Sequence, residues 1–426
     1  MDYAAARAVL DRLSRFEVKP GLERISHLLE RLGYPERAYP AIHVAGTNGK
    51  GSVVAMLDAV LRAAGYRVGR VTSPELLDFR DRVAIDGAWL PEEDWAAGVE
   101  RMGSMIDEMS DQPAQFEAIT AFALDAFAQA MIDVAVVEVG LGGRFDATNV
   151  TSSILSILTN VSLDHTAILG DSIEKIAWEK AGIAKKDVPL LVGPLEREAL
   201  SIVENECGEV GAKLVRAADL GIDLEPDSAE AGSYRIAGPD LPERVTLPLL
   251  GGYQRENLEL ALAAIELLRA QGFDLPSDAV REGLESVTWP GRFEVVRQAP
   301  TVILEGAHNL AGAQALAADV ERFAPDRAHR SLLFGVLGDK DAAGMLDALG
   351  PRFERVALTA SSSPRALAVS DLGKLADELC VPHACYDSVA SALDAELAAS
   401  APEDVWFVAG SLTVVAEARR YLEGGG

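Results

Sequence analysis

A glycine-rich turn at residues 46–52, with the sequence GTNGKGS, carries one lysine and one serine directly after a short apolar run. Glycine lets backbone N–H groups approach an anion closely, Lys50 adds a positive charge, and the Ser52 hydroxyl can ligate Mg²⁺. The spacing is tighter than in the common G-x-x-x-x-G-K-[ST] pattern, so a chance glycine-lysine turn is the alternative. The residue types nevertheless predict a loop that binds phosphate groups.

The segments on either side of this turn support the prediction. Ile42–Ala45 has the apolar composition of a buried strand, and residues 53–65 have helical periodicity that is predicted to end at Gly65. Strand, glycine-rich turn and helix follow one another in the order that a phosphate-binding loop requires. We therefore expect the loop to lie at the carboxyl end of a sheet strand, where open α/β sheets bind their ligands.

Polar residues also follow other predicted strands. Glu138 directly follows the apolar run Val134–Val137 and precedes three glycines and an arginine, so its carboxylate is expected at the rim of the sheet, as a Mg²⁺ ligand. The alternative is a glutamate that only caps nearby amides. Asp164 and His165 follow the next predicted strand, which we expect one strand over from Glu138, and His165 is either a metal ligand or a structural histidine.

Lys180 lies near the end of a predicted helix over residues 174–183, where a cation also suits the helix dipole. Two further strands of the second half of the chain, Thr301–Leu304 and Ser331–Phe334, are each followed by a polar turn. Two domains that each present such turns imply a cleft between them.

Helical segments alternate with short β-branched runs, which is typical of an α/β fold. We predict a P-loop-type doubly wound central domain over residues 1–296, beginning with a helical segment, and a smaller Rossmann-like α/β domain over residues 297–426. The break in periodicity at Trp289–Arg292 supports this boundary. Residues 220–247 are predicted to form a hairpin insertion. The other predicted strands and helices are Val68–Val71, Ser153–Leu158, Leu190–Val192, Arg355–Leu358, Val405–Val408, Asn257–Gln271 and Ser277–Ser286.

Composition limits the possible partners. The 426 residues include 39 Lys and Arg against 66 Asp and Glu, which gives a formal net charge of −27. A field of that sign argues against non-specific binding to nucleic acid or to anionic membranes, and it is also typical of a highly soluble protein or of a salt-rich habitat. Three cysteines without metal-site spacing, and a charged amphipathic N-terminus in place of a signal peptide, predict a cytoplasmic protein.

Ten segments taken together resemble a known family. They are GTNGKGS at 46–52, TSP at 72–74, FEAITA at 116–121, EVGLGGRFDATNV at 138–150, LDHTAILGDSIEKIAWEKAGIAK at 163–185, GGYQREN at 251–257, WPGRFEVV at 289–296, GAHNLAGA at 306–313, FGVLGDKD at 334–341 and GSLTVVAE at 410–417. In this order they resemble folylpolyglutamate synthases and their bifunctional form with dihydrofolate synthase activity, within the Mur-ligase superfamily. The resemblance spans nearly the whole chain.

The resemblance implies an ATP-dependent ligase that uses Mg²⁺. The carboxylate of a pterin substrate takes the γ-phosphoryl group of ATP, and the amine of L-glutamate then displaces phosphate to form an amide. It implies an ATP-binding central domain, a C-terminal glutamate-ligase domain, small-molecule partners only, and a monomer. Another Mur-type amino-acid ligase and a non-catalytic nucleotide-binding protein of this superfamily are the alternatives.

The resemblance also implies roles for individual residues. The implied catalytic residues are Lys50, His165, Lys180 and His308. The implied ATP-binding residues are Thr47, Asn48, Gly49, Lys50, Gly51, Ser52, Asn257, Arg292 and Glu305, with Gln254 near His308. The implied metal ligands are Ser52, Ser73, Glu138, His165 and Lys180, the last as a carbamylated lysine. The implied pterin contacts are Gly21, Leu22, Glu23, Arg24, Ala114, Gln115, Phe116, Glu117, Phe145, Asp146 and Ala147.

This chain departs from the family pattern at a few positions. Glu75 replaces a histidine, Asp78 and Arg80 replace an arginine and an asparagine, and the usual DGAHNP is EGAHNL, with Glu305 and Leu310. Glu305 keeps the charge of aspartate with one more methylene. The two acidic changes after residue 74 lie near the expected pterin side, so they bear on the choice between dihydropteroate and folates.

Overall fold

The computed structural model describes residues 1–14, 21–227 and 232–424. They divide into two compact units, of which the first comprises residues 1–162, 169–248 and 255–287, and the second comprises residues 163–168, 249–254 and 288–426. The short segment 163–168 therefore belongs to the second unit, although the chain on both sides of it belongs to the first. Both units are α/β structures, which confirms the predicted fold class.

The first unit is built on an eight-stranded sheet in the order β4-β3-β2-β5-β1-β6-β7-β8. Six strands are parallel, and β3 and β4 add an antiparallel edge. The strands are β1 (Ala41–Ala45), β2 (Val68–Val71), β3 (Val83–Ile85), β4 (Ala88–Trp89), β5 (Val134–Glu138), β6 (Ser153–Leu158), β7 (Pro189–Val192) and β8 (Lys213–Arg216). All five residues of β1 are buried, as expected for a central strand covered on both faces.

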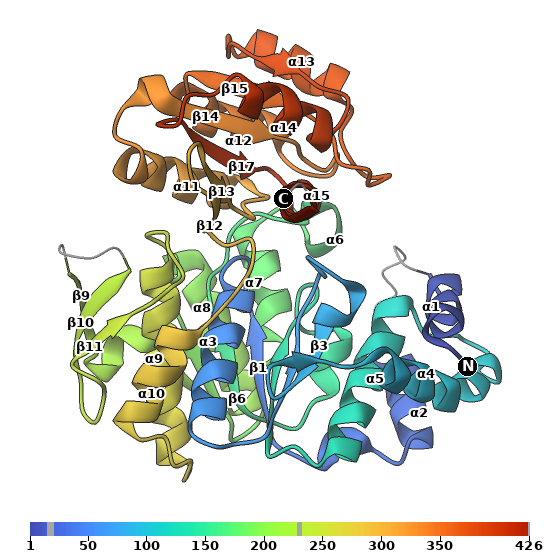
Figure 1. The fold of residues 1–426 in the computed structure, drawn as a ribbon. Helices are drawn as coiled ribbons and strands as arrows, with labels where there is room; N and C mark the ends of the chain where they lie inside the picture. The colour runs from blue at the N-terminus through green and yellow to red at the C-terminus, as the bar shows by residue number, and fades with distance from the viewer. Residues whose placement is uncertain (15–20, 228–231, 425–426) are drawn as a thin grey trace. The chain divides into compact units, whose positions relative to one another are not determined.

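Helices on both sides of this sheet complete the first unit (Figure 1). They are α1 (Tyr3–Arg12), α2 (Glu23–Arg31), α3 (Lys50–Ala63), α4 (Glu92–Asp107), α5 (Gln115–Ala130), α7 (Ile173–Ala181), α8 (Arg197–Val210), α9 (Gln254–Ala270) and α10 (Ser277–Ser286). The first three residues of the short helix α6 (Thr166–Leu169) belong to the second unit. Helix α3 is buried from Gly51 to Leu61, so its first turn is held firmly against the sheet. Aromatic packing of Trp95 on Phe122, with ring centroids 4.2 Å apart, joins α4 to α5.

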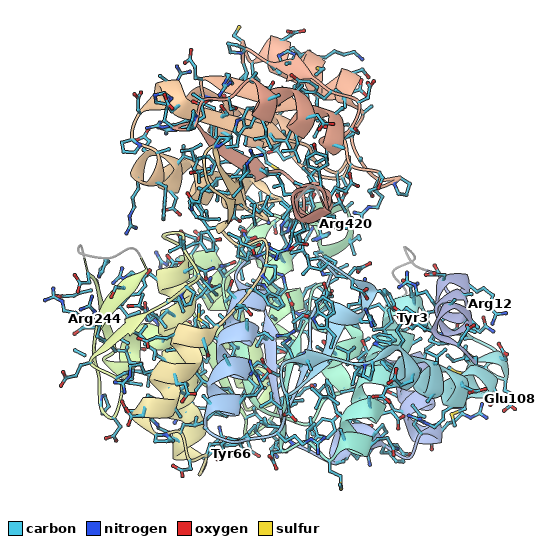
Figure 2. All side chains as sticks on the ribbon, in the orientation of Figure 1. Tyr3, Arg12, Tyr66, Glu108, Arg244 and Arg420 are labelled. Carbon is cyan, nitrogen blue, oxygen red and sulfur yellow. The ribbon has the colours of Figure 1, made fainter. Side chains whose placement is uncertain are left out.

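A small antiparallel sheet lies at one end of the first unit beside α10, opposite the end formed by α1, α2 and α4 (Figure 1). Its strands β9 (Asp223–Pro226), β10 (Ser233–Ala237) and β11 (Arg244–Thr246) are ordered β11-β10-β9. The predicted hairpin insertion is therefore a three-stranded sheet. Charged side chains such as Arg12, Glu108 and Arg244 lie on the outside of the unit (Figure 2).

The second unit has a six-stranded sheet in the order β12-β13-β17-β14-β15-β16, in which only β12 is antiparallel to its neighbour. Its strands are β12 (Glu294–Arg297), β13 (Thr301–Leu304), β14 (Arg330–Phe334), β15 (Arg355–Leu358), β16 (Ala384–Cys385) and β17 (Val405–Ala409). Its helices are α11 (Leu310–Phe323), α12 (Ala342–Leu349), α13 (Val369–Glu378), α14 (Val389–Ala398) and α15 (Leu412–Gly424). Among the described residues, no helix is both long and apolar enough to cross a membrane.

Candidate active site

The glycine-rich turn of the first unit connects β1 to α3 and is packed tightly against its surroundings. Gly46 and Gly49 have φ angles of +150° and +83°, in the region that favours glycine. A Cβ on Gly46 would lie 1.8 Å from Oγ1 of Thr159, and a Cβ on Gly49 would lie 2.3 Å from Oδ1 of Asn257. Both glycines are therefore required by the close approach of the turn to the ends of β6 and α9.

Hydrogen bonds to the segment after β6 fix the conformation of the turn. The N–H groups of Thr47 and Asn48 donate to the backbone oxygen and to Oδ1 of Asn160, each at 3.0 Å. The Thr47 hydroxyl donates to the oxygen of Ser162 at 3.2 Å and accepts from its N–H at 3.0 Å. These hydrogen bonds restrict the conformations that the loop can adopt, which limits the conformational entropy lost on binding.

Two lysines from separate segments meet at this loop. Nζ of Lys50, in the first turn of α3, donates to the oxygens of Gly46 and Thr47 at 3.1 and 3.2 Å. Nζ of Lys180, near the end of α7, donates to the same Gly46 oxygen at 2.8 Å, and Lys180 is only 5% exposed. The ammonium groups of both lysines thus lie near the start of α3, where they create a local positive field that attracts an anion such as a triphosphate.

Glu138 and Ser73 lie together at the carboxyl ends of the neighbouring strands β5 and β2. The Ser73 N–H donates to Oε2 of Glu138 at 3.3 Å, and Glu138 is buried. Carboxylate and hydroxyl oxygens are the donors that Mg²⁺ prefers, so the residue types fit the predicted metal ligands. The described residues contain no group of three or more His, Cys, Asp or Glu side chains able to hold a metal ion. A site here would therefore depend on oxygens from bound phosphates.

The expectation that Asp164 and His165 lie one strand over from Glu138 is wrong. The strand β6 follows β5 in the chain, but β1 lies between them in the sheet. Asp164 and His165 moreover belong to segment 163–168 of the second unit.

The three segments predicted to contact a pterin are connected to one another by contacts at or near the loop at residues 140–146. Nε of Arg24 donates to Oε2 of Glu117 at 3.0 Å, which joins α2 to α5. A Cβ on Gly140 would lie 2.5 Å from the Phe116 ring and 3.1 Å from Oδ2 of Asp146, so both side chains pack against the same glycine. Ala147 is buried, and Phe145 is 45% exposed.

Not every predicted pterin contact faces this loop. Nε2 of Gln115 donates to the Leu10 oxygen and to Oδ1 of Asp11, at 3.1 and 3.0 Å, so this amide faces α1. Leu22 packs against the core beneath α1 and α5. Gly21, with φ +113°, lies where a Cβ would meet the Glu23 carboxylate.

The Asp146 side chain is buried and forms hydrogen bonds within and next to the 140–146 loop. Its carboxylate accepts hydrogen bonds from the N–H groups of Leu141 and Thr148 at 2.7 and 3.0 Å. Burial raises the pKa of Asp146, although these hydrogen bonds oppose the rise. The residue therefore holds the loop in shape and is not itself exposed to solvent.

In the second unit, Glu305 directly follows β13 and lies in a buried polar cluster. Its Oε2 accepts from the Tyr253 hydroxyl at 2.6 Å and from the Phe293 N–H at 2.9 Å. Burial raises the pKa of Glu305, and the nearby Arg292 guanidinium opposes the rise. A Cβ on Gly306 would lie 1.7 Å from Nη1 of Arg292, so Arg292 lies directly over the turn that follows β13.

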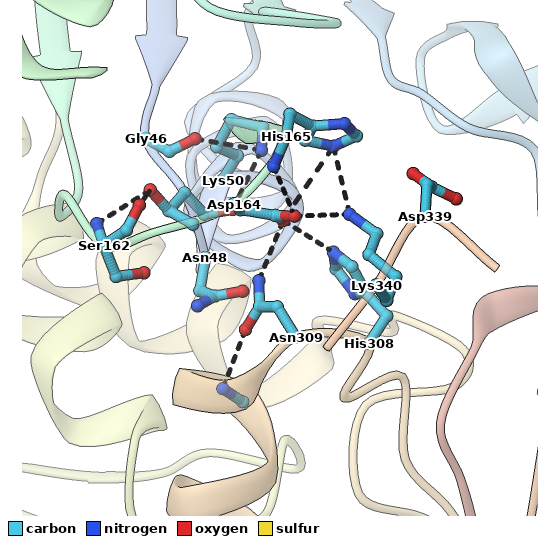
Figure 3. A network of polar contacts seen from close by, with 12 residues as sticks. Gly46, Asn48, Lys50, Ser162, Asp164, His165, His308, Asn309, Asp339 and Lys340 are labelled. Carbon is cyan, nitrogen blue, oxygen red and sulfur yellow. Dashed lines mark hydrogen bonds and ion pairs between the residues drawn. The ribbon is translucent and has the colours of Figure 1, made fainter. Parts of the chain in front are cut away.

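A second cluster of this unit is centred on Asp164 (Figure 3). Its carboxylate accepts from Nδ2 of Asn309 at 3.0 Å and is paired with the Lys340 ammonium, and Nε2 of His308 lies 3.8 Å from it. Burial alone would raise the pKa of Asp164, but His165, Lys340 and His308 together hold it below its usual value. Burial and Lys340 lower the pKa of His308 to about 4. Since Nδ1 of His308 donates to the Gly306 oxygen at 2.8 Å, its Nε2 carries the lone pair.

Comparisons with known proteins give the family. A model described as "Mur ligase, glutamate ligase domain" matches residues 291–412. The dihydrofolate synthase/folylpolyglutamate synthase of Bacillus subtilis is 37% identical over 380 residues, which cover 87% of this chain and 88% of that protein. This chain belongs to the dihydrofolate synthase/folylpolyglutamate synthase family. A probable bifunctional folylpolyglutamate synthase/dihydropteroate synthase of Haloferax volcanii is 39% identical over 98% of this chain, and the chain spans 50% of that relative's length.

Solved structures of this family have the same fold. Mycobacterium tuberculosis folylpolyglutamate synthase, complexed with ADP and AMPPCP, is 36% identical with a TM-score of 0.89 over 99% of each chain. E. coli FolC in complex with DHPP and ADP is 33% identical with a TM-score of 0.88 over 100% of this chain and 98% of that chain. A Yersinia pestis bifunctional folylpolyglutamate synthase/dihydrofolate synthase, complexed with AMPPNP and Mn ion, is 31% identical with a TM-score of 0.85 over 99% and 98%.

The acidic departures from the family pattern are neutralised within their own loop. Nε of Arg82 donates to Oε2 of Glu75 at 2.8 Å, and Nε of Arg80 donates to Oδ1 of Asp78 at 3.0 Å. Asp81 accepts from two backbone N–H groups of the same loop, at 2.9 and 2.8 Å. The loop after Pro74 therefore presents paired charges.

Several central residues of these clusters were not among the predicted site residues. Asp164, Asn309 and Lys340 form the middle of the second cluster, and Asn160 shapes the phosphate loop. Each follows a strand, and all but Asn160 lie within a quoted motif, so position at a strand end was the available signal. What the motif does not reveal is that Asp164 pairs with Lys340, 176 residues later in the chain.

Proposed function

We propose that this chain is an ATP-dependent ligase that joins L-glutamate to dihydropteroate, to (tetrahydro)folate, or to both, as a dihydrofolate synthase and folylpolyglutamate synthase. One observation carries the proposal: Lys50 and Lys180, from separate segments, both donate to the Gly46 oxygen of the glycine-rich loop. Membership of the family supports the same activity. The choice of substrates follows from the names of the relatives, and the choice of the phosphate-binding site follows from the geometry of the loop.

The reaction has two steps. A carboxylate oxygen of the pterin substrate attacks the γ-phosphorus of ATP, the bond from that phosphorus to the bridging oxygen breaks, and ADP leaves. The amine of L-glutamate then attacks the acyl carbon, an amide bond forms, phosphate leaves, and the amine loses its proton. A carboxylate is a poor acyl donor, and phosphorylation turns one of its oxygens into a good leaving group. Catalysis is therefore mainly positioning and neutralisation of phosphate charge.

The phosphate loop is proposed to hold the triphosphate, with Lys50 neutralising its charge. The metal ligands named below would hold Mg²⁺, which would supply positive charge to offset the charge of the phosphate groups. The proposed ATP-binding residues are Thr47, Asn48, Gly49, Lys50, Gly51, Ser52, Asn257, Arg292 and Glu305. The proposed metal ligands are Ser52, Ser73, Glu138 and His165. Lys180 would join them only after carbamylation, which replaces its ammonium group, and the hydrogen bond of that group to the Gly46 oxygen, with an anionic oxygen ligand.

The pterin side is proposed to consist of the segments 21–24, 114–117 and 145–147, which are connected by contacts at or near the 140–146 loop. His308 is proposed to act on L-glutamate, because its Nε2 lone pair can accept a hydrogen bond from an amine. We assign ATP binding to residues 1–296 together with Glu305, and glutamate ligation to residues 297–426. We also propose that the protein is a cytoplasmic monomer that binds neither nucleic acid nor membranes.

Release of inorganic phosphate from ATP and L-glutamate tests the proposal. We expect phosphate release to require a pterin acceptor, with dihydropteroate and tetrahydrofolate measured separately, and the glutamylated product to appear in equal amount by mass spectrometry. Omission of L-glutamate should stop turnover. If neither pterin supports phosphate release, the ligase proposal is wrong.

Replacement of Lys50 tests the phosphate loop. Lys50→Ala removes a charge that is aimed at the phosphates, so we expect kcat/KM to fall roughly 100- to 1,000-fold. The matched control is Lys186→Ala, which removes an exposed lysine of the same unit and should leave kcat/KM unchanged. Equal activity of the two variants would refute the role of Lys50.

A further inference from the structure

Two large aromatic side chains of the first unit face each other at the surface. Phe145, in the loop before Ala147, is 45% exposed, and Trp178, on α7, is 41% exposed. Their ring centroids are 6.4 Å apart at an interplanar angle of 58°. Exposed aromatic surface is unfavourable in water, so a pair held in this way is a candidate for contact with a ligand.

Arg144 fixes the orientation of the tryptophan. Its guanidinium carbon lies 3.9 Å from the centroid of the Trp178 ring, and its Nη2 donates to the Trp178 oxygen at 3.1 Å. The same guanidinium is paired with the carboxylate of Glu206 on α8. One face of the indole is therefore covered by a tethered cation, and the ring is held in place without a ligand.

Backbone contacts hold the two aromatic residues at a constant separation. The Arg144 N–H donates to the Glu179 oxygen at 2.8 Å, and Nδ2 of Asn149 donates to the oxygens of Arg144 and Gly182, each at 3.0 Å. A Cβ on Gly143 would lie 2.9 Å from the oxygens of Glu179 and Lys180, so the loop lies directly on the end of α7. The aromatic pair is thus a preorganised surface.

The helix that carries Trp178 also contacts the phosphate loop. Lys180, two residues after Trp178, is buried and donates to the Gly46 oxygen at 2.8 Å. Residues two apart on a helix point to opposite sides, which matches the buried lysine and the exposed tryptophan. A substrate with planar rings at one end and a carboxylate at the other needs a ring-binding surface near the phosphate loop.

We propose that Trp178 is a further substrate-binding residue, which stacks with Phe145 against the planar rings of the pteroyl substrate. The inference rests on the proposed function and extends it, because the family resemblance assigns Phe145 to the pterin and assigns to the helix of Trp178 only the metal-associated Lys180. Pteroyl rings suit the site, since flat π-systems bind best to aromatic faces and edges.

Kinetics of the 426-residue protein test the role of Trp178. We expect Trp178→Ala to raise the KM for dihydropteroate roughly three- to tenfold, with little change in kcat or in the KM values for ATP and L-glutamate. Trp178→Phe retains an aromatic face and should restore most of the affinity. Trp89→Phe is the control, because Trp89 is a 38% exposed tryptophan on β4 and should leave all four values unchanged.

Tryptophan fluorescence gives an independent measurement of binding. In the presence of AMPPCP, dihydropteroate should quench part of the fluorescence of the wild type and of Trp89→Phe, and clearly less in Trp178→Phe. An unchanged KM for dihydropteroate in Trp178→Ala, with equal quenching in all three proteins, would overturn the inference and leave the proposed function intact. If the wild type neither turns over nor shows quenching with dihydropteroate or with tetrahydrofolate, the proposed function and this inference both fall.

Discussion

At the scale of single side chains, His308 connects the geometry of the second unit to an expected pH dependence of stability. Burial and the Lys340 ammonium lower its pKa to about 4, while Asp164 opposes the shift. The ordinary pKa of histidine, which applies in the unfolded chain, is 6.5. Between about pH 6.5 and pH 4, His308 therefore binds a proton in the unfolded chain but not in the folded chain. The contribution of the neutral His308 to the free energy of unfolding is therefore fully present above about pH 6.5 and is lost as the pH falls toward 4.

Urea unfolding at several pH values between 7 and 4 measures this contribution. In His308→Gln the free energy of unfolding should fall less steeply with decreasing pH than in the wild type, because the titrating group is gone. His27→Gln, which replaces an exposed histidine on α2, should keep the wild-type slope. Asp164 does not disturb this measurement. Because its pKa is lowered in the folded chain, its protonation reduces the free energy of unfolding only below about pH 4. If the free energy of unfolding falls equally steeply with pH in both variants, His308 does not have the lowered pKa.

At the scale of elements, the contact between the 140–146 loop and α7 depends on the absence of a side chain at Gly143. An added Cβ would lie 2.9 Å from two backbone oxygens, which cannot move without shifting the helix. We expect Gly143→Ala to lower the free energy of unfolding by about 1–3 kcal/mol and to reduce kcat/KM, because the loop would be displaced from Lys180. The measurements are chemical denaturation and phosphate release.

A matched control for this substitution lies on α8. Gly208 is a helical glycine with no atom within 4 Å of an added Cβ, so Gly208→Ala meets no obstacle. It should stabilise the protein by about 0.5–1 kcal/mol, without an effect on turnover. A Gly143→Ala protein that matches Gly208→Ala in stability and activity would show that the close approach is unimportant.

The elements also show how far the sequence predicts the structure. The strands β2, β6, β13 and β15 and the helix α10 begin and end at the predicted residues, since runs of apolar or periodic residues bounded by turns mark them clearly. The predicted end of α3 at Gly65 is two residues late. Short edge strands such as β4 and β16 bury little apolar surface and leave almost no pattern to detect.

Spatial order was harder to predict than the elements themselves. Chain order places β6 directly after β5, yet β1 separates them, because a crossover returns the chain past the first strand. For the same reason, the predicted site residues could be listed, but the pairing of Asp164 with Lys340 could not. Partners so distant in the chain leave no local pattern of spacing, which is what sequence motifs report.

At the scale of the whole molecule, the net charge of −27 implies a protein that is stabilised by salt. Like charges on the folded surface repel one another, and their repulsion extends over a screening length of about 10 Å at 0.1 M salt and about 3 Å at 1 M. We therefore expect Tm to rise between 0.1 and 1 M KCl, as differential scanning calorimetry would measure, and to rise most steeply at the low end. Replacement of two exposed acids on α8, Glu204→Lys with Glu209→Lys, changes the net charge by two units for each substitution and should reduce the rise. If Tm rises equally in the variant and the wild type, the salt acts on the burial of apolar surface and not on charge repulsion. A Tm that stays constant or falls with KCl would contradict the electrostatic argument.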